Sequence, residues 1–238
     1  ETKGGCITQP PFLQEEGMRL RRKPWIDEAV TAYESFVYLH PGEEVKGKWR
    51  EQFATPSAPL WVELGTGKGN FISRMAEIHK NVNFIGIEVQ LGVLYYAARK
   101  CAAAELCNVR LLRFDISFLE SIFAEGEADR FFINFCDPWP KNRHAKRRLT
   151  HRSFLDRYAR LLTPHGTIHF KSDNAGLFTF TLGEFKACRW PLTDVTYDLH
   201  NSLILNEAVT EYEAKFSAAG QPIFHCVAER PAEVHYDE

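Results

Sequence analysis

Apolar and amphipathic runs alternate along the chain from residue 60 onward, and each run predicts one element. The apolar runs predict strands at 60–64, 83–89, 109–115, 131–137 and 166–173. The amphipathic runs between them predict helices at 69–79, 91–106 and 153–162. Strands that are apolar throughout are typical of a parallel sheet with helices on both faces. We therefore expect an α/β fold with a doubly wound, Rossmann-like sheet.

The N-terminal residues depart from this pattern. Residues 1–17 show no hydrophobic period and contain paired glycines and prolines, so we expect a flexible tail there. Met18 is one of two methionines and a candidate native start, which would make residues 1–17 a leader foreign to the protein. Residues 18–59 are expected to form a basic segment and a helical extension, with a helix at 27–38.

The last third of the chain has a different pattern again. It predicts strands at 192–199 and 222–228, one of them antiparallel to an otherwise mostly parallel sheet, whereas residues 206–218 fit neither pattern clearly. The main domain is expected to span residues 60–230, with a flexible tail at 231–238.

Composition narrows the class of protein. The 238 residues are 45% hydrophobic, which suits one large globular domain, and no apolar run is long enough to span a bilayer. The six cysteines have no Cys-x-x-Cys spacing, so they suggest neither a zinc site nor a redox pair. We expect no membrane association, no metal and a reducing, cytoplasmic location.

The charges are distributed unevenly. The formal net charge is -2, yet ten of the 29 basic residues lie in two acid-free segments, 19–23 and 141–152. The other 19 basic and 31 acidic residues leave the remainder at -12. Concentrated basic segments on an acidic body predict a polyanion-binding surface, although chance clustering on a solvated surface would give the second segment the same composition.

The predicted first strand runs into the sequence Glu-Leu-Gly-Thr-Gly-Lys-Gly, in which Gly65, Gly67 and Gly69 alternate after Glu63. Glycines at this spacing allow a sharp turn and a close approach of the backbone to a ligand, or simply a tight turn without one. The pattern differs from the Gly-x-Gly-x-x-Gly of dinucleotide-binding enzymes. A carboxylate at the mouth of the turn suits a cationic sulfonium cofactor that carries an amino group.

Each of the five predicted parallel strands ends near an acid, and these acids are Glu63, Glu88, Asp115, Asp137 and Asp173. One such acid alone is adequately explained as a helix cap or a solvated turn. Together they predict a shared site at one edge of the sheet, because all five strands are expected to end there. Glu88 follows Gly69 by 19 residues, a position suited to accept hydrogen bonds from ribose hydroxyls, and Asp115 could accept from an adenine amino group.

A stiff loop follows the fourth predicted strand. Pro138 and Pro140 restrict the backbone, so Asp137 and Trp139 are held in place, and the basic segment comes directly after them. The indole of Trp139 could stack on a nucleobase or anchor the loop in the core. An acid, an indole and a basic strip in this order suit the modification of a nucleobase.

Several blocks together resemble the bacterial tRNA (guanine-N7)-methyltransferases, which are class I S-adenosylmethionine-dependent enzymes. The resemblance runs from about Met18 to the vicinity of Arg230, with one departure at Cys136. The blocks that carry it are 63–69, 87–88, 137–149, 169–174, 210–213 and 215–216. It implies S-adenosylmethionine as methyl donor, S-adenosylhomocysteine as product, and N7 of a guanosine in the tRNA variable loop (position 46) as acceptor.

The resemblance also assigns roles to residues. It implies that Asp137 is catalytic and that the cofactor is held by Glu63, Gly65, Gly67, Gly69, Glu88, Asp115 and Asp137. The residues it implies for substrate or RNA contact are Lys141, Arg143, His144, Lys146, Arg147, Arg148, Asp173, Thr210, Glu211, Tyr212 and Glu213. The expected partner is tRNA, and the enzyme is expected to be a monomer or a homodimer.

The implied chemistry is consistent with the residues present. Guanine N7 carries a free lone pair, so its attack on a sulfonium methyl needs no base, and a fixed carboxylate such as Asp137 would stabilise the positive charge that the guanine gains. Glu211 or Glu213 could accept hydrogen bonds from guanine N1 and N2. The Thr210 to Glu213 spacing also predicts a helix capping box. A Rossmann dehydrogenase and a non-catalytic RNA-binding module remain alternatives.

Overall fold

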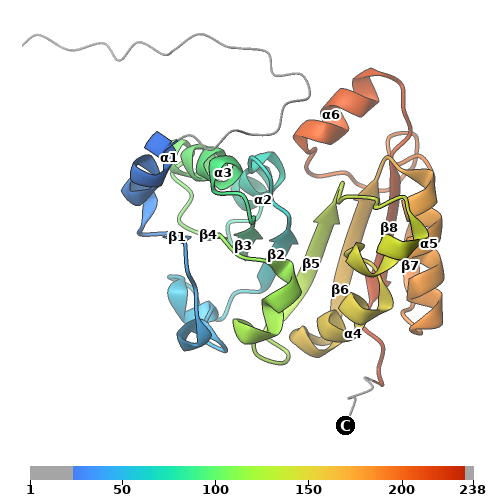
Figure 1. The fold of residues 1–238 in the computed structure, drawn as a ribbon, viewed down its shortest axis with the longest axis horizontal. Coiled ribbons are helices and arrows are strands. Elements are labelled where there is room, and N and C mark those ends of the chain that lie inside the picture. Colours follow the sequence, from blue (N-terminus) through green and yellow to red (C-terminus); the bar gives the residue numbers. More distant parts are fainter. Residues whose placement is uncertain (1–23, 234–238) are drawn as a thin grey trace, which may run out of the picture.

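An eight-stranded sheet forms the centre of the computed structural model, which describes residues 24–233 (Figure 1). The strand order is β1-β4-β3-β2-β5-β6-β8-β7, and β8 runs in the opposite direction to the other seven described strands. The strands are β1 (Val37–Tyr38), β2 (Leu60–Leu64), β3 (Asn83–Ile87), β4 (Val109–Leu112), β5 (Ala128–Asn134), β6 (Leu162–Ser172), β7 (Leu192–Thr196) and β8 (Phe224–Glu229). The expected α/β, mostly parallel sheet is confirmed.

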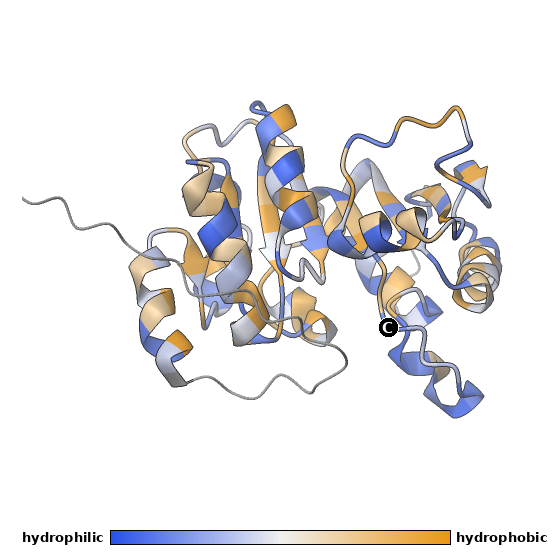
Figure 2. Cartoon of the chain, turned by 90° about the horizontal axis from the view of Figure 1, so that it is seen from above, coloured by the Kyte–Doolittle hydropathy of each residue, from blue (hydrophilic) through white to orange (hydrophobic). Residues whose placement is uncertain are grey.

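Helices cover both faces of this sheet. The α-helices are α1 (Pro24–Ala29), α2 (Asn70–Ile78), α3 (Leu91–Ala103), α4 (Arg152–Leu161), α5 (Ala175–Ala187) and α6 (Glu211–Ala218). Short 3-10 helices are η1 (Val30–Tyr33), η2 (Glu43–Val45), η3 (Arg50–Gln52), η4 (Ile116–Ser121) and η5 (Asn142–Arg147). Figure 2 shows hydrophilic and hydrophobic residues on the same helices, as expected for helices with one buried face.

Two hydrophobic cores lie on opposite faces of the sheet, because successive side chains of a strand point in opposite directions. Val62 and Phe131 pack into the core that α4 and α5 cover, together with Trp49 from the N-terminal extension. On the other face, Trp61 and Phe132 pack with residues of α1, α2 and α3. Each fully buried side chain of this size contributes about 1.5–3 kcal/mol of hydrophobic stabilisation. No helix within residues 24–233 has the length and apolar character needed to span a membrane.

The sheet corrects several expected boundaries. The helix predicted at 27–38 is wrong, because α1 ends at Ala29 and Val37–Tyr38 pairs with β4 as an edge strand. The strand predicted at 131–137 begins earlier and ends at Asn134, since Phe135 has a φ of 51° that breaks the extended backbone. Helix α5 was not predicted at all, although its sequence is apolar. The tail at 1–17, the basic residues at 19–23 and most of the tail at 231–238 lie outside the described residues.

Candidate active site

The glycine turn between β2 and α2 has the backbone that its sequence predicts. Gly65, Gly67 and Gly69 have φ angles of 86°, 57° and 80°, values that side chains with a Cβ rarely adopt. The amides of Gly65 and Thr66 donate to the carbonyl oxygen of Ile87 at 2.9 and 2.8 Å. The turn is therefore attached to the end of β3, and α2 begins directly after it.

Glu63 lies beneath this turn, within β2, and is only 3% exposed. Its Oε2 accepts a hydrogen bond from Oγ1 of Thr66 at 2.6 Å, and its Oε1 accepts one from Nδ2 of Asn134 at 3.0 Å. Burial raises the pKa of Glu63 to about 7 despite these hydrogen bonds. The carboxyl group therefore binds a proton readily near neutral pH, and a nearby positive charge would favour its ionised form.

Asn134 was not among the predicted site residues. Its side chain is 9% exposed, and its Oδ1 finds no hydrogen-bond donor in residues 24–233. A buried acceptor without a partner costs free energy, so this oxygen could accept a hydrogen bond from a bound ligand. The sequence signal for it was modest: an amide at the end of the fourth predicted strand, three residues before Asp137.

Glu88 connects the glycine turn to the next strand. Its Oε2 accepts from the amide of Gly67 at 3.2 Å, and its Oε1 accepts from the amide of Gln90 at 2.9 Å. Burial raises the pKa of Glu88 above its usual value, and the charge of Asp137 adds to that rise. Asp115, by contrast, is exposed and caps η4 by accepting from the amide of Ser117 at 2.8 Å.

The loop after β5 presents Asp137 to solvent. Phe135 and Trp139 have positive φ angles of 51° and 42°, which is strained backbone of the kind that gathers at functional sites. Residues 137–140 line an open hollow. Arg148 fixes this loop, because its Nε and Nη2 donate to the carbonyl oxygens of Pro138 and Trp139, both at 3.0 Å.

Arg148 therefore differs from the rest of the predicted RNA-binding strip. It is 9% exposed and its guanidinium also lies 4.3 Å from the ring centre of Phe180. Its hydrogen bonds to the loop give it a structural task that the sequence prediction of a phosphate contact did not foresee. Lys141, Arg143 and Lys146 are exposed.

Trp139 is half-buried, so it is not the core anchor that one interpretation of the sequence expected. The guanidinium of Arg147 lies 5.0 Å from its ring centre, and the ring of His144 meets it edge-on at 5.8 Å. Both residues come from η5, so the indole and the basic strip form one surface. This surface directly follows Asp137 in the chain.

Some of the residues expected to contact the substrate are exposed, and others are buried or paired with protein side chains. Asp173 is exposed just beyond the end of β6, and Tyr212 is 63% exposed at the start of α6. The capping box between Thr210 and Glu213 is present. Glu213 is 0% exposed, so its carboxylate does not face a guanine as expected; Glu211 Oε1 is paired with Lys100 Nζ at 2.5 Å.

The site thus combines a glycine turn, acids beside it and an adjoining basic surface. Within residues 24–233, no group of three or more His, Cys, Asp or Glu side chains is arranged to hold a metal ion. The arrangement can hold a cationic ligand by its carboxylates and a polyanion by η5. Figure 1 shows α6 above the edge of the sheet toward which β5 points, so α6 is placed over the same edge.

Comparison with known proteins supports this arrangement. A family model described as "Putative methyltransferase" matches residues 57–226. A tRNA (guanine-N(7)-)-methyltransferase of Geobacillus sp. (strain WCH70) is 48% identical over 214 residues, which cover 90% of this chain and 96% of that protein. The chain belongs to the tRNA (guanine-N7)-methyltransferase family. A second member of the tRNA (guanine-N7)-methyltransferase family, from Streptococcus pyogenes serotype M6, is 45% identical over 89% of this chain and 99% of its own.

The fold extends beyond this family. The solved structure of an antibiotic-related methyltransferase matches with a TM-score of 0.54 and 16% identity, covering 90% of this chain and 96% of that one. At that identity the likeness concerns the fold alone. For this member of the tRNA (guanine-N7)-methyltransferase family, the comparison therefore supports the architecture, whereas the roles of individual side chains rest on their geometry.

Proposed function

We propose that this protein transfers the methyl group of S-adenosylmethionine to N7 of a guanosine in tRNA, in the variable loop. The observation that carries the proposal is the glycine turn with Glu63 and Glu88 beside it, in a chain whose curated relatives are named for this reaction. S-adenosylmethionine would supply an electrophilic methyl group. The enzyme would act in the cytoplasm, on tRNA.

The residues of the turn fit that cofactor. Buried Glu63 offers negative charge to a ligand that carries a sulfonium and an amino group, and the unpaired Oδ1 of Asn134 beside it can accept a hydrogen bond. Glu88 uses one hydrogen bond on each carboxylate oxygen, and each oxygen can accept a second. These remaining acceptor positions suit the ribose hydroxyls.

The surface of η5 fits the RNA. Arg143, Lys146 and Arg147 can neutralise phosphates, and the half-buried indole of Trp139 can stack on an unpaired base. Asp137 precedes these residues in the chain, and its charge contributes to the raised pKa of Glu88. A base held by this surface would meet the cofactor at the edge of the sheet.

Asp137 is the residue proposed to assist the methyl transfer. Guanine N7 attacks through its own lone pair, so no proton has to be removed before the bond forms. The guanine becomes positively charged as it gains the methyl group, and a nearby carboxylate stabilises that charge. The role of Asp137 is therefore electrostatic, and the role of Arg148 is to hold the loop that carries it.

The experiment is to incubate the protein with an unmodified tRNA transcript and methyl-labelled cofactor, then identify the labelled nucleoside by mass spectrometry after digestion. We expect label in N7-methylguanosine. A transcript with adenosine in place of the variable-loop guanosine is the control and should remain unlabelled. Absence of label in RNA, or label in another nucleoside, would contradict the proposal.

A further inference from the structure

A buried lysine joins the sheet to the segment that leads into α6. Lys171 lies near the end of β6, in register with Asn134 of β5, and is 7% exposed. Its Nζ donates to Oδ1 of Asn206 at 2.6 Å, to the carbonyl oxygen of Ala208 at 3.0 Å and to Oε2 of Glu213 at 3.2 Å. An ammonium group has three protons to donate, so all of them are used.

Both carboxylate oxygens of Glu213, the partner of Lys171, also have several partners. Glu213 is 0% exposed, and its Oε1 accepts from Nδ2 of Asn206 at 2.5 Å and lies 3.3 Å from Nε2 of His200. Its Oε2 also accepts from the backbone amide of Thr210 at 3.4 Å. A carboxylate in this position depends on Lys171 for charge compensation, because burial in the protein removes it from water.

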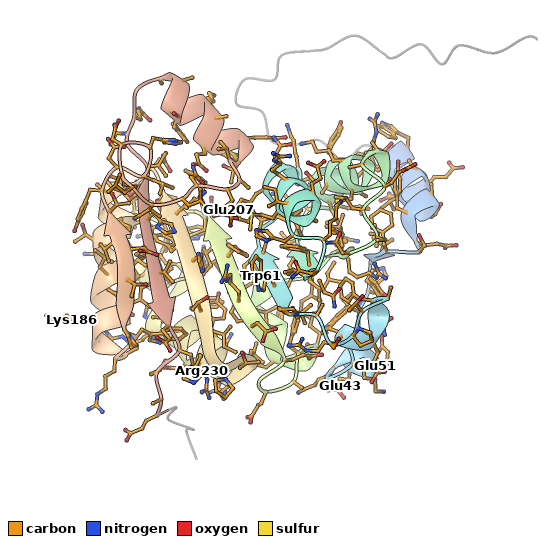
Figure 3. All side chains as sticks on the ribbon, turned by 180° about the vertical axis from the view of Figure 1, so that it is seen from behind. Glu43, Glu51, Trp61, Lys186, Glu207 and Arg230 are labelled. Carbon is orange, nitrogen blue, oxygen red and sulfur yellow. The ribbon has the colours of Figure 1, made fainter. Side chains whose placement is uncertain are left out.

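Two further acids of the same stretch have basic partners on other elements. Glu211 pairs with Lys100 of α3, which also donates to Oδ1 of Asn70, the first residue of α2 after the glycine turn. Oε1 of Glu207 lies 3.1 Å from Nε2 of His79, without hydrogen-bond alignment. Figure 3, which shows the molecule from behind, labels Glu207 close to Trp61 of β2 in that view. We refer to residues 206–213 as the acidic segment.

Polar contacts account for much of what holds the acidic segment. Among the residues of α6, Glu213 is the buried one, so the helix does not dock through an apolar face. Leu203 and Leu205, just before the segment, are 106% and 80% exposed. Apolar contact comes from Ala208, which is buried, and from Phe216, whose ring stacks on that of Phe135 at 6.4 Å.

We propose that Lys171 is a positioning residue for methyl transfer, which holds the acidic segment and its exposed Tyr212 in place to receive the tRNA. The proposal rests on the function proposed above. Lys171 is suited to this task because its register neighbour Asn134 bonds Glu63, so the cofactor side and the RNA side of the site meet at this point of the sheet. Loss of the ammonium would free the acidic segment while leaving the glycine turn in place.

The first test is the kinetics of Lys171→Met, with Lys186→Met as control because Lys186 is exposed on α5 (Figure 3). We expect the KM for tRNA to rise by about ten- to a hundredfold, the scale of effect of a misplaced positioning group. The dissociation constant of the cofactor should change less than this KM. A merely structural role would instead reduce the fraction of active enzyme, with the KM unaltered, and that result would overturn the proposal.

The second test is hydrogen exchange without any substrate, so it does not depend on the proposed function. Amides of residues 206–218 should exchange faster in Lys171→Met than in wild type, whereas those of α3 and α5 should not. Glu213→Gln keeps the shape of the side chain and removes its charge, so it should also raise the KM for tRNA and speed the exchange of residues 206–218. If Lys171→Met does not fold, Glu213→Gln is used for both tests. Unchanged exchange in either variant would refute the proposed attachment.

The double variant distinguishes a direct pair from two independent effects. In Lys171→Met with Glu213→Gln, no uncompensated buried carboxylate remains, so the combined change in exchange and in KM should be smaller than the two single changes added together. Additive changes would mean that Lys171 and Glu213 act separately, and the proposal would fall. If the variants exchange as expected yet the wild-type protein methylates no tRNA, the proposed function fails while the attachment stands.

Discussion

At the scale of single residues, the site depends on a carboxyl group that burial makes weakly acidic. Glu63 is enclosed by β2, the glycine turn and Asn134, and its pKa is raised to about 7. A carboxylate attracts a cationic ligand most strongly when no protein cation is hydrogen-bonded to it. Here the two direct partners, Thr66 and Asn134, are neutral.

The raised pKa of Glu63 predicts a specific dependence of stability on pH. Between about pH 4.5 and 7 the folded protein keeps this proton while the unfolded chain has lost it, so the contribution of Glu63 to the free energy of unfolding falls as pH rises through that window. Glu63→Gln removes this contribution. The free energy of unfolding of the variant minus that of wild type should increase by about 3 kcal/mol from pH 4 to pH 8.

The measurement is urea unfolding of wild type and Glu63→Gln across that pH range. Glu125→Gln serves as the control for the loss of one carboxylate, because Glu125 is exposed in the loop before β5. A constant difference for Glu63→Gln would show that Glu63 is ionised in the folded protein at acidic pH.

Asp137 gives a second prediction at this scale. Asp137→Asn keeps the shape of an exposed side chain and removes its charge, so folding and tRNA affinity should hardly change. The carboxylate matters most once the guanine is cationic, and kcat should therefore fall by about ten- to a thousandfold. Single-turnover rates at saturating cofactor and tRNA would show this. A wild-type rate would remove Asp137 from the catalytic step.

At the scale of elements, the close approach of α2 and α3 depends on one glycine. A Cβ on Gly69 would lie 2.7 Å from Cβ and 2.8 Å from Cα of Ala97 in α3, and the φ of Gly69 is +80°. Gly220 has a similar φ of +70° but no atom within 4 Å of such a Cβ. An Ala at Gly220 would have only the cost of the backbone conformation, whereas an Ala at Gly69 would have that cost and the cost of overlap with Ala97.

Gly220→Ala should lower the free energy of unfolding by about 1–2 kcal/mol, the cost of a left-handed conformation for a residue with a Cβ. Gly69→Ala should lower it by about a further 1–3 kcal/mol, the cost of overpacking. Denaturant unfolding of both variants measures this difference. Equal losses would mean that α3 can move away from the turn without cost.

Elements also show what the sequence could predict and what it could not. The bounds of β2 were predicted correctly, because four of its five residues are buried and the run ends at the glycine turn. Edge strand β1 was missed, since two residues that pair with β4 leave no periodic signal. Helix α5 was missed because its sequence is apolar on most sides and does not separate into one apolar and one polar face.

The site was predicted where its chemistry is local and missed where it depends on distant partners. The turn and Glu88 follow from spacing along the chain, and the structure brings them together. Arg148 was expected to contact RNA and Glu213 to contact the substrate, although charged side chains can be buried when they are paired. Each is buried because it meets groups that no spacing reveals: loop carbonyls for Arg148, and Lys171, 42 residues away, for Glu213.

At the scale of the whole molecule, charge is arranged so that one side can approach RNA. The net charge of the chain is -2, but η5 and its flanks carry basic residues without an acid between 141 and 152. If Arg143, Lys146 and Arg147 neutralise phosphates, tRNA affinity should fall steeply with salt, because each contact releases counterions. Replacing all three with Ala should weaken binding and reduce the salt slope by about one unit or less per residue.

The measurement is tRNA affinity over a salt series, with cofactor affinity as the test of folding. Lys48, Lys80 and Lys186 are exposed elsewhere on the molecule, so replacing these three with Ala makes the same change in net charge away from η5. That control should leave the salt slope nearly as in wild type. Equal slopes for the η5 variant and wild type would place the RNA contact on another surface.

The strand order has a consequence for how the protein is made. Within the described residues, β7 pairs with β8 and with no other strand, and β8 comes after α6 in the chain. A ribosome releases the N-terminal part first, so β7 leaves it before its partner exists. A nascent chain that has reached the end of α6 holds the whole glycine turn but an unfinished sheet edge. The β7–β8 pair of the sheet can therefore form only after the glycine turn and η5 have been translated and have been free to fold.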